Sequence, residues 1–290
     1  MVKNENGWLS YMSINEIIEI LSYPFMARAI IVGILISLCA SLLGVILVLK
    51  NYSLIGHGLS DVGFASISIA VACGFSPIYL STPIVILASF VIMYISQSKK
   101  INGDIAIGIF STGSLALGVI VTAISNGLNM DVYAYMFGSI LSMNNTDVFM
   151  SIILSAVVLT LFILFYNRLF IVTIDESFAK SIGINIQFYQ FLISLLTALT
   201  VVIGIRMMGT LLISSLIIFS AFIAKKFVRS FKSLMFLSAT ISILCFLIGV
   251  LVSLLLNIPT GASIVIVNII VLIISFIISK ISDSISLCKN

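Results

Sequence analysis

The stretch "LIGHGLSDVG", residues 54–63, holds the two side chains of the sequence that are best suited to chemistry. His57 is the only histidine of the chain, and Asp61 follows it four positions later. Residues four apart on an α-helix lie on the same face, so both side chains can reach one ligand. Imidazole and carboxylate together suit divalent cations such as Mn²⁺, Fe²⁺ and Zn²⁺. We therefore take His57 and Asp61 as candidate metal ligands.

Two other interpretations of this pair stay open. The two side chains can hydrogen-bond to each other in a packed interior, or they can relay a proton. Counting the helical rise from Lys50 places His57 about 10 Å and Asp61 about 16 Å deep, and an acid at that depth usually marks an ion pathway. Small and polar residues continue the same helical stripe, so we expect Ala65 and Ser68 to line a path.

The composition sets the class of protein. Of the 290 residues, 61% are hydrophobic and only 8% are charged, whereas about a quarter of a soluble domain is charged. Apolar runs recur between Pro24 and Ile281, and each is long enough to cross a hydrocarbon core of roughly 30 Å. The sequence therefore predicts an all-α, polytopic membrane protein with about eight or nine spans. The net charge of +4 is explained by positively charged cytoplasmic loops, so no nucleic-acid partner is expected.

We predict one membrane domain over residues 24–281, preceded by an amphipathic surface segment over 1–23 and followed by a tail over 282–290. Residues 130–143 are too short to span and are expected to form a re-entrant or interfacial piece. Arg206 is interpreted as a loop charge between two short spans. The predicted spans are 25–49, 53–73, 78–97, 105–125, 147–167, 188–205, 207–224, 233–256 and 261–279.

The positions of Lys and Arg predict the orientation of the chain. Lys50, Lys225 and Lys226 are expected on the cytoplasmic side, together with the C-terminus. Nine spans then place the N-terminus outside. The sequence contains no G-x-x-x-x-G-K-[ST] motif, so an ATPase that drives transport has to be a separate subunit.

Several blocks of the sequence, in order, carry a resemblance to a known family. They are "YPFMARAI", "GVILVLKNYSLIGHGLSDVGFA", "DIAIGIFSTGSLALGV", "DVYAYMFGSIL", "IDESFAKSIGIN", "MMGTLLISSLII" and "NIPTGASIVIV". Between about Tyr23 and Ile281 the chain resembles the membrane subunits of bacterial ABC importers for zinc, manganese and iron(II). The resemblance implies a homodimeric permease of the vitamin B12-type importer fold, embedded in the lipid of the bacterial cytoplasmic membrane. It also implies cytoplasmic ATPase subunits, an external metal-binding lipoprotein, and a transported divalent cation in place of a permanently bound cofactor or an enzymatic activity.

The resemblance assigns residues 172–186 as the segment that couples the permease to the ATPase. Asp175 and Glu176 can start a short helix there, because anions favour the positive end of a helix dipole. Gly183 can end that helix, and Phe178 offers an exposed apolar side chain to the partner. The expected coupling residues are Asp175, Glu176, Phe178, Ala179 and Gly183.

The chain departs from the family pattern in two places. The family usually reads Gly-Asp-x-x-Ser-His in the second span, whereas here Gly56 is followed by His57, and Ser60 by Asp61. The family's Pro-Ala-Ala is replaced by residues 219–221, Phe-Ser-Ala, which removes an expected helix kink. Both departures leave the metal preference open.

Other classes of transporter make different demands on the sequence. A permease for a metal chelate (haem, a siderophore or cobalamin) requires a wide cavity and no ligand pair. A gradient-driven secondary cation transporter is expected to have inverted repeats and several membrane carboxylates. A membrane enzyme requires a second catalytic cluster, and the sequence does not suggest one.

Overall fold

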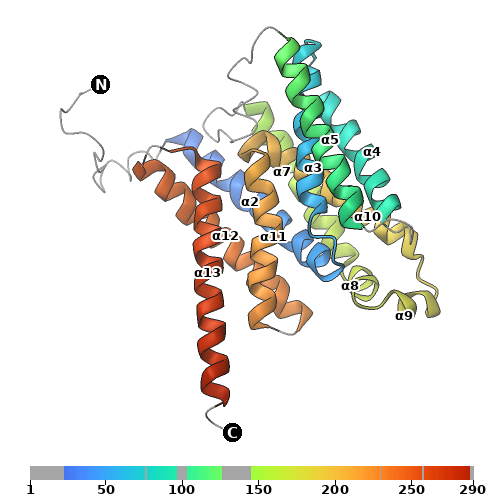
Figure 1. Cartoon of the computed structure of the whole chain (residues 1–290), viewed down its shortest axis with the longest axis vertical. Helices are drawn as coiled ribbons and strands as arrows, with labels where there is room; N and C mark the ends of the chain where they lie inside the picture. The colour runs from blue at the N-terminus through green and yellow to red at the C-terminus, as the bar shows by residue number, and fades with distance from the viewer. Residues whose placement is uncertain are drawn as a thin grey trace, which may run out of the picture.

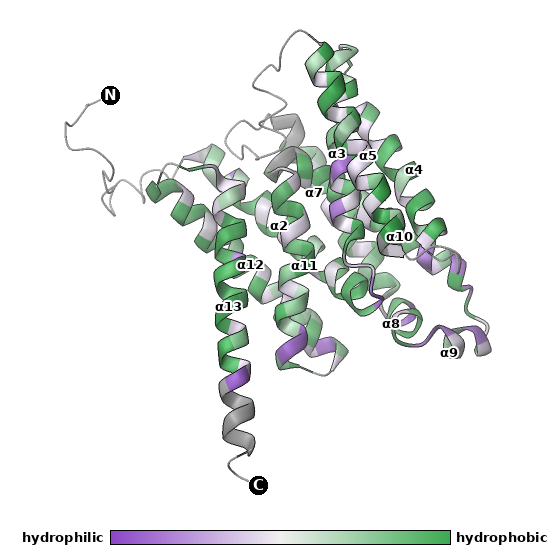
Figure 2. Cartoon of the chain, in the orientation of Figure 1, coloured by the Kyte–Doolittle hydropathy of each residue, from purple (hydrophilic) through white to green (hydrophobic). Residues whose placement is uncertain are grey.

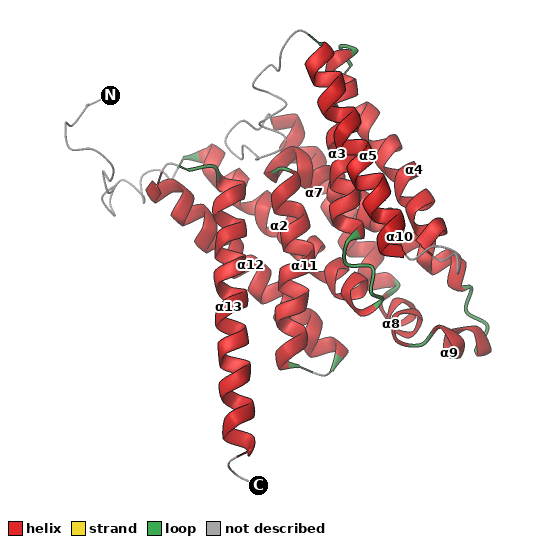
Figure 3. Ribbon diagram, in the orientation of Figure 1, coloured by secondary structure: helices red, strands yellow, loops and turns green. Residues whose placement is uncertain are grey.

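The structure, a computed structural model, describes residues 23–75, 77–96, 103–125, 145–228, 230–256 and 258–287. Within these residues all regular secondary structure is helical (Figures 1 and 3), so the all-α prediction is confirmed. The helices are α2 (Pro24–Leu49), α3 (Ile55–Ala72), α4 (Pro77–Ser96), α5 (Gly103–Ile124), α7 (Asn145–Leu164), α8 (Tyr166–Ile174), α9 (Glu176–Ser181), α10 (Ile186–Met208), α11 (Thr210–Phe227), α12 (Phe231–Leu256) and α13 (Thr260–Leu287).

The number of membrane spans agrees with the sequence-based prediction. In the described part of the chain, eight helices are long and apolar enough to cross a membrane. They are α2, α3, α4, α5, α10, α11, α12 and α13. A ninth span is possible if α7 and α8, which are bent by 69° relative to each other, act as one unit. Figure 2 shows apolar residues along most of the helix surfaces.

The helices divide into an inner and an outer group. In α2, α3, α10 and α11, between 61% and 78% of the apolar stretch is buried, compared with 28% to 33% in α4, α5, α12 and α13. The outer helices expose large apolar side chains such as Tyr94 and Phe236. Because an apolar side chain is stable in contact with lipid tails, these outer surfaces are suited to face the bilayer.

Serine hydroxyls join an outer helix to an inner one. Ser238 and Ser242 of α12 donate to the backbone carbonyls of Ser41 at 3.4 Å and Ser37 at 3.0 Å in α2. Interhelical hydrogen bonds of this kind contribute about 0.6 kcal/mol each in a membrane protein. The small side chains also allow the two helices to approach closely.

The structure corrects one interpretation of the sequence. Arg206 does not lie in a loop, because α10 continues to Met208. The break falls at Gly209, whose φ of 85° and ψ of 162° favour glycine. As expected from the missing proline, α11 then runs from Thr210 to Phe227 as one helix.

The ends of the predicted domain are only partly described. α13 continues to Leu287, through residues assigned to the tail. The predicted surface helix before Tyr23 and the predicted re-entrant piece at 130–143 lie outside the described residues.

The contact between α2 and α11 leaves no space for a side chain at Gly44. A Cβ atom added there would lie 2.1 Å from the carbonyl oxygen of Ile217, so the two backbones would have to separate. We expect Gly44→Ala to lower the free energy of unfolding by about 1–3 kcal/mol. Thermal unfolding of the purified protein in detergent measures this effect. Gly108→Ala in α5 is the matched control, because a Cβ there meets nothing within 4 Å; equal melting temperatures for the two variants would contradict the close approach.

Candidate metal site

The candidate ligands His57 and Asp61 both lie on α3, one of the inner helices. This helix begins at Ile55 and packs against α4, α5, α10 and α11. His57 lies in its first turn and Asp61 lies one turn further along. The His57 side chain is 50% exposed, whereas that of Asp61 is 8% exposed. The predicted shared face is therefore present, with the imidazole at its open end and the carboxylate at its buried end.

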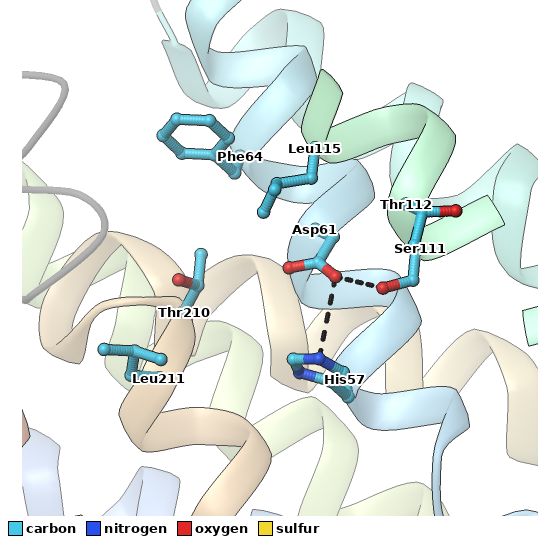
Figure 4. Close-up of a pocket in the computed structure, with 8 residues that line it drawn as sticks. All are labelled: His57, Asp61, Phe64, Ser111, Thr112, Leu115, Thr210 and Leu211. Atoms are coloured by element: carbon cyan, nitrogen blue, oxygen red, sulfur yellow. Dashed lines mark hydrogen bonds and ion pairs between the residues drawn. The ribbon is translucent and has the colours of Figure 1, made fainter. Parts of the chain in front are cut away.

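Both side chains line a cavity of about 260 Å³. Three helices contribute to it: α3, α5 and the first turn of α11. Figure 4 shows Phe64 and Leu115 on one side of the carboxylate and His57 on the other. The lining residues are His57, Asp61, Phe64, Ser111, Thr112, Leu115, Thr210 and Leu211.

The Asp61 carboxylate has a fixed orientation in this cavity. The Ser111 hydroxyl of α5 donates a hydrogen bond to Asp61 Oδ2. His57 Nε2 lies 3.8 Å from the same oxygen, which is too long for a hydrogen bond. The two groups lie within ion-pair distance, as the dashed line in Figure 4 marks, but the half-exposed imidazole is not part of a packed interior.

The described residues around the cavity offer few ligand atoms for a cation. An imidazole nitrogen and a carboxylate oxygen are offered to the same cavity, and the described residues contain no group of three or more His, Cys, Asp or Glu side chains able to hold a metal ion. A closed structural metal site in a protein usually has four ligands. The site that one chain provides is therefore open.

The sequence did not point to Ser111, Thr112 or Thr210 as cavity residues. The only local signal was a pair of adjacent hydroxyl residues in the apolar α5 segment, and a threonine directly after Gly209. Which hydroxyl faces Asp61 depends on how α3, α5 and α11 pack together.

The two predicted path residues lie elsewhere on α3. Ala65 and Ser68 are both buried, and the Ser68 hydroxyl donates to the Phe64 carbonyl at 2.9 Å. The Cα atom of Ala65 lies next to Gly118 of α5. Neither residue lines the cavity around Asp61, and their place along a transport path stays a prediction.

The predicted coupling segment forms a separate unit at the end of the bundle where α8, α9 and the start of α10 meet (Figure 1). Its short helix α9 spans Glu176–Ser181, as its sequence suggested. The Asp175 side chain caps this helix by accepting a hydrogen bond from the Phe178 backbone N–H at 3.0 Å. Gly183 follows the helix with a φ of 79°, which is a common way for a helix to end.

The side chains of this segment point in different directions. Phe178 is 54% exposed. Ala179 is fully buried with Val172 and Ile184 in a small apolar cluster, so it supports the segment and does not form part of its surface. Glu176 forms an ion pair with Lys50, with 2.5 Å between Nζ and Oε1.

Comparisons with known proteins find transport permeases. The chain is 30% identical over 257 residues to the manganese import system permease protein ScaB of Streptococcus parasanguinis, covering 89% of this chain and 91% of that protein. It is 27% identical over 244 residues to the high-affinity zinc uptake system membrane protein ZnuB of Haemophilus influenzae, covering 84% of this chain and 94% of that protein. Among solved structures, PsaBC from Streptococcus pneumoniae in complex with Fab matches with a TM-score of 0.81 and 30% identity, over 91% of this chain and 95% of that one.

The family assignment follows from the extent of these matches. The chain is a multi-pass protein of the bacterial cytoplasmic membrane, since its apolar helices match those of ABC permeases along most of its length. The model of the ABC 3 transport family matches residues 22–279, nearly the whole chain. This chain therefore belongs to the ABC 3 transport family.

Proposed function

We propose that this chain is the permease subunit of an ATP-driven importer for a divalent transition-metal ion, and that the ion passes through a site formed by His57 and Asp61. Manganese and zinc stand in the names of its relatives, and iron(II) is the third cation of the class that the sequence suggested. All three ions accept imidazole and carboxylate ligands.

The observation that carries this proposal is the shared cavity of His57 and Asp61. A carboxylate inside an apolar bundle is costly to keep ionised unless a partner or an ion stabilises it. Ser111 satisfies one oxygen of Asp61, while the half-exposed imidazole remains accessible from the cavity. A metal ion can therefore reach both ligands and leave again, as transport requires.

The other interpretations fit this cavity less well. A proton relay needs a continuing series of titratable groups, but the remaining lining residues offer only hydroxyl and apolar side chains. A large chelate makes no use of a buried acid beside an imidazole. The geometry therefore favours a bare or partly hydrated cation.

A second copy of the chain would complete the site. His57 is half exposed on the single chain, so a partner can approach it. A two-fold axis near this cavity would bring a second His57 and Asp61 opposite the first, giving up to four protein ligands. The exposed side of His57 thus leaves room for the proposed homodimer.

Energy is proposed to enter through the segment around α9. The chain has no phosphate-binding loop of its own, and the exposed Phe178 is well placed to dock against separate cytoplasmic ATPase subunits. An external metal-binding lipoprotein is expected to deliver the ion from the opposite side of the membrane.

The metal site is tested by removing its ligands one at a time. His57→Ala and Asp61→Ala should each abolish metal uptake without preventing assembly, because either change leaves one ligand per chain. Ser111→Ala should weaken metal binding by roughly ten- to a hundredfold, since a hydrogen bond to a charged group contributes about 1.5–3 kcal/mol. Binding of Mn²⁺ and Zn²⁺ to the purified complex and uptake into proteoliposomes are measured together.

The matched control is Ser66→Ala on α3. The Ser66 hydroxyl is buried like that of Ser111, but it donates to the Gly63 carbonyl at 2.8 Å. Wild-type uptake in the His57→Ala and Asp61→Ala variants would exclude this site. The exchanged variant, His57→Asp with Asp61→His, has the residue order that is usual in the family. It should show more metal uptake than either alanine variant, because both ligand types are kept on the same helical face.

The docking role of Phe178 is tested by truncation. Phe178→Ala should weaken the association of the ATPase subunits by about thirtyfold or more, because hot-spot aromatic side chains contribute about 2 kcal/mol or more. Co-purification of the ATPase subunits and metal-stimulated ATP hydrolysis should both fall as a result. Phe236→Ala is the control, since Phe236 is 78% exposed on the outer helix α12. Equal ATPase association in both variants would remove Phe178 from the contact.

A further inference from the structure

We propose that the ion pair between Lys50 and Glu176 is the internal link that transmits movement of the coupling helix α9 to the site helix α3. Lys50 and Glu176 would then be positioning residues of the transport cycle, acting through His57 and Asp61 without touching the ion. This inference rests on the proposed function, in which α9 receives the movement of an ATPase.

The link joins parts of the chain that lie 126 residues apart. Lys50 is the C-cap residue of α2, and its Nζ lies 2.5 Å from Glu176 Oε1 at the start of α9. Gln190 of α10 donates from Nε2 to the same oxygen at 3.1 Å. The backbone of α9 packs on α8 and α10, so the ion pair extends these contacts to the turn between α2 and α3.

The burial of Lys50 makes the link difficult to break. Its side chain is only 3% exposed, whereas the Glu176 side chain is 50% exposed. The bond itself lies at the exposed end of the bundle, so the cost of separating the two groups is smaller than for a buried pair, but the covered Lys50 side chain would still lose its carboxylate partner. A displacement of α9 should therefore move Lys50 with it.

The turn between Lys50 and α3 is short and closed by hydrogen bonds. The Tyr52 N–H donates to the Leu47 carbonyl at 2.8 Å, and the Ile55 N–H donates to the Tyr52 carbonyl at 3.1 Å. His57 lies in the first helical turn that follows. Because these hydrogen bonds leave the connection few free torsions, a displacement of Lys50 should also displace the start of α3 and, with it, His57.

Tyr52 extends the link to the second helix of the site. Burial, and then the negative charge of Glu176, raise the pKa of Tyr52 above its usual value. A methyl group added to Gly103 would lie 3.6 Å from Tyr52 Cε1, so the ring lies next to the first residue of α5. The same helix carries Ser111, which holds Asp61. The turn thus contacts both helices that fix the carboxylate.

The experiment compares variants that remove the two charges with a variant that exchanges them. The full complex is reconstituted in proteoliposomes, and Mn²⁺ or Zn²⁺ uptake is divided by ATP hydrolysed. The neutral pair, Lys50→Met with Glu176→Gln, leaves no buried unpaired charge and should fold. We expect it to lower the uptake per ATP by about fivefold or more, the lower range of typical coupling between sites. The exchanged pair, Lys50→Glu with Glu176→Lys, should recover most of this ratio.

Two controls separate the link from simpler effects. Lys232→Met removes an exposed lysine from the start of α12 and should leave the ratio unchanged. Metal binding to the complex without ATP should be the same in the neutral pair as in the unmodified protein, because His57, Asp61 and Ser111 are retained. A loss of metal binding in the neutral pair would assign Lys50 and Glu176 to the fold of the site and overturn the link.

The outcomes also distinguish the link from the proposed function. If the unmodified complex shows no ATP-dependent metal uptake, the proposed function is wrong. If the unmodified complex transports and the neutral pair keeps its uptake per ATP, the link alone is wrong. An exchanged pair that remains as uncoupled as the neutral pair would also overturn the link, because the attraction between the two charges would then be irrelevant.

Discussion

A carboxylate inside an apolar helix bundle needs a partner, and in this chain that requirement falls on Asp61. Ser111 donates to it, His57 lies 3.8 Å away, and a cavity opens beside it. Supplying these neighbours requires α3, α5 and α11 to meet at one level of the bundle. The packing of these helices therefore supplies one buried acid with a hydrogen-bond donor and with an open cavity beside it.

The division into inner and outer helices follows from the same requirement. The inner helices α2, α3, α10 and α11 bury most of their surfaces, and Gly44 allows α2 and α11 to approach at backbone distance. Outer helices expose apolar side chains that are stable in lipid. His57 lies in the first turn of the inner helix α3, and its side chain is half exposed. Its imidazole therefore faces the cavity without interrupting the packed core.

The segment around α9 combines two directions of contact. Phe178 points outward, where the proposed function places an ATPase, and Glu176 points inward to Lys50. Ala179, Val172 and Ile184 hold the two in a fixed relation through a small apolar cluster. A rigid unit of this kind can pass a movement from one face to the other, whereas a flexible loop would absorb it.

The sequence by itself determined the all-α class, the approximate positions of eight spans, the shared face of His57 and Asp61, and the ends of α9. These features depend on local hydropathy, on i,i+4 spacing and on capping residues, all of which are readable along the chain. Only the tertiary structure decided that Ser111 holds Asp61, that Lys50 meets Glu176, that Ala65 and Ser68 pack away from the cavity, and that α10 continues past Arg206. The physical reason is that membrane helices are apolar on nearly every side, so their sequences do not specify which faces meet; close approaches such as that of Gly44 to Ile217 make that choice.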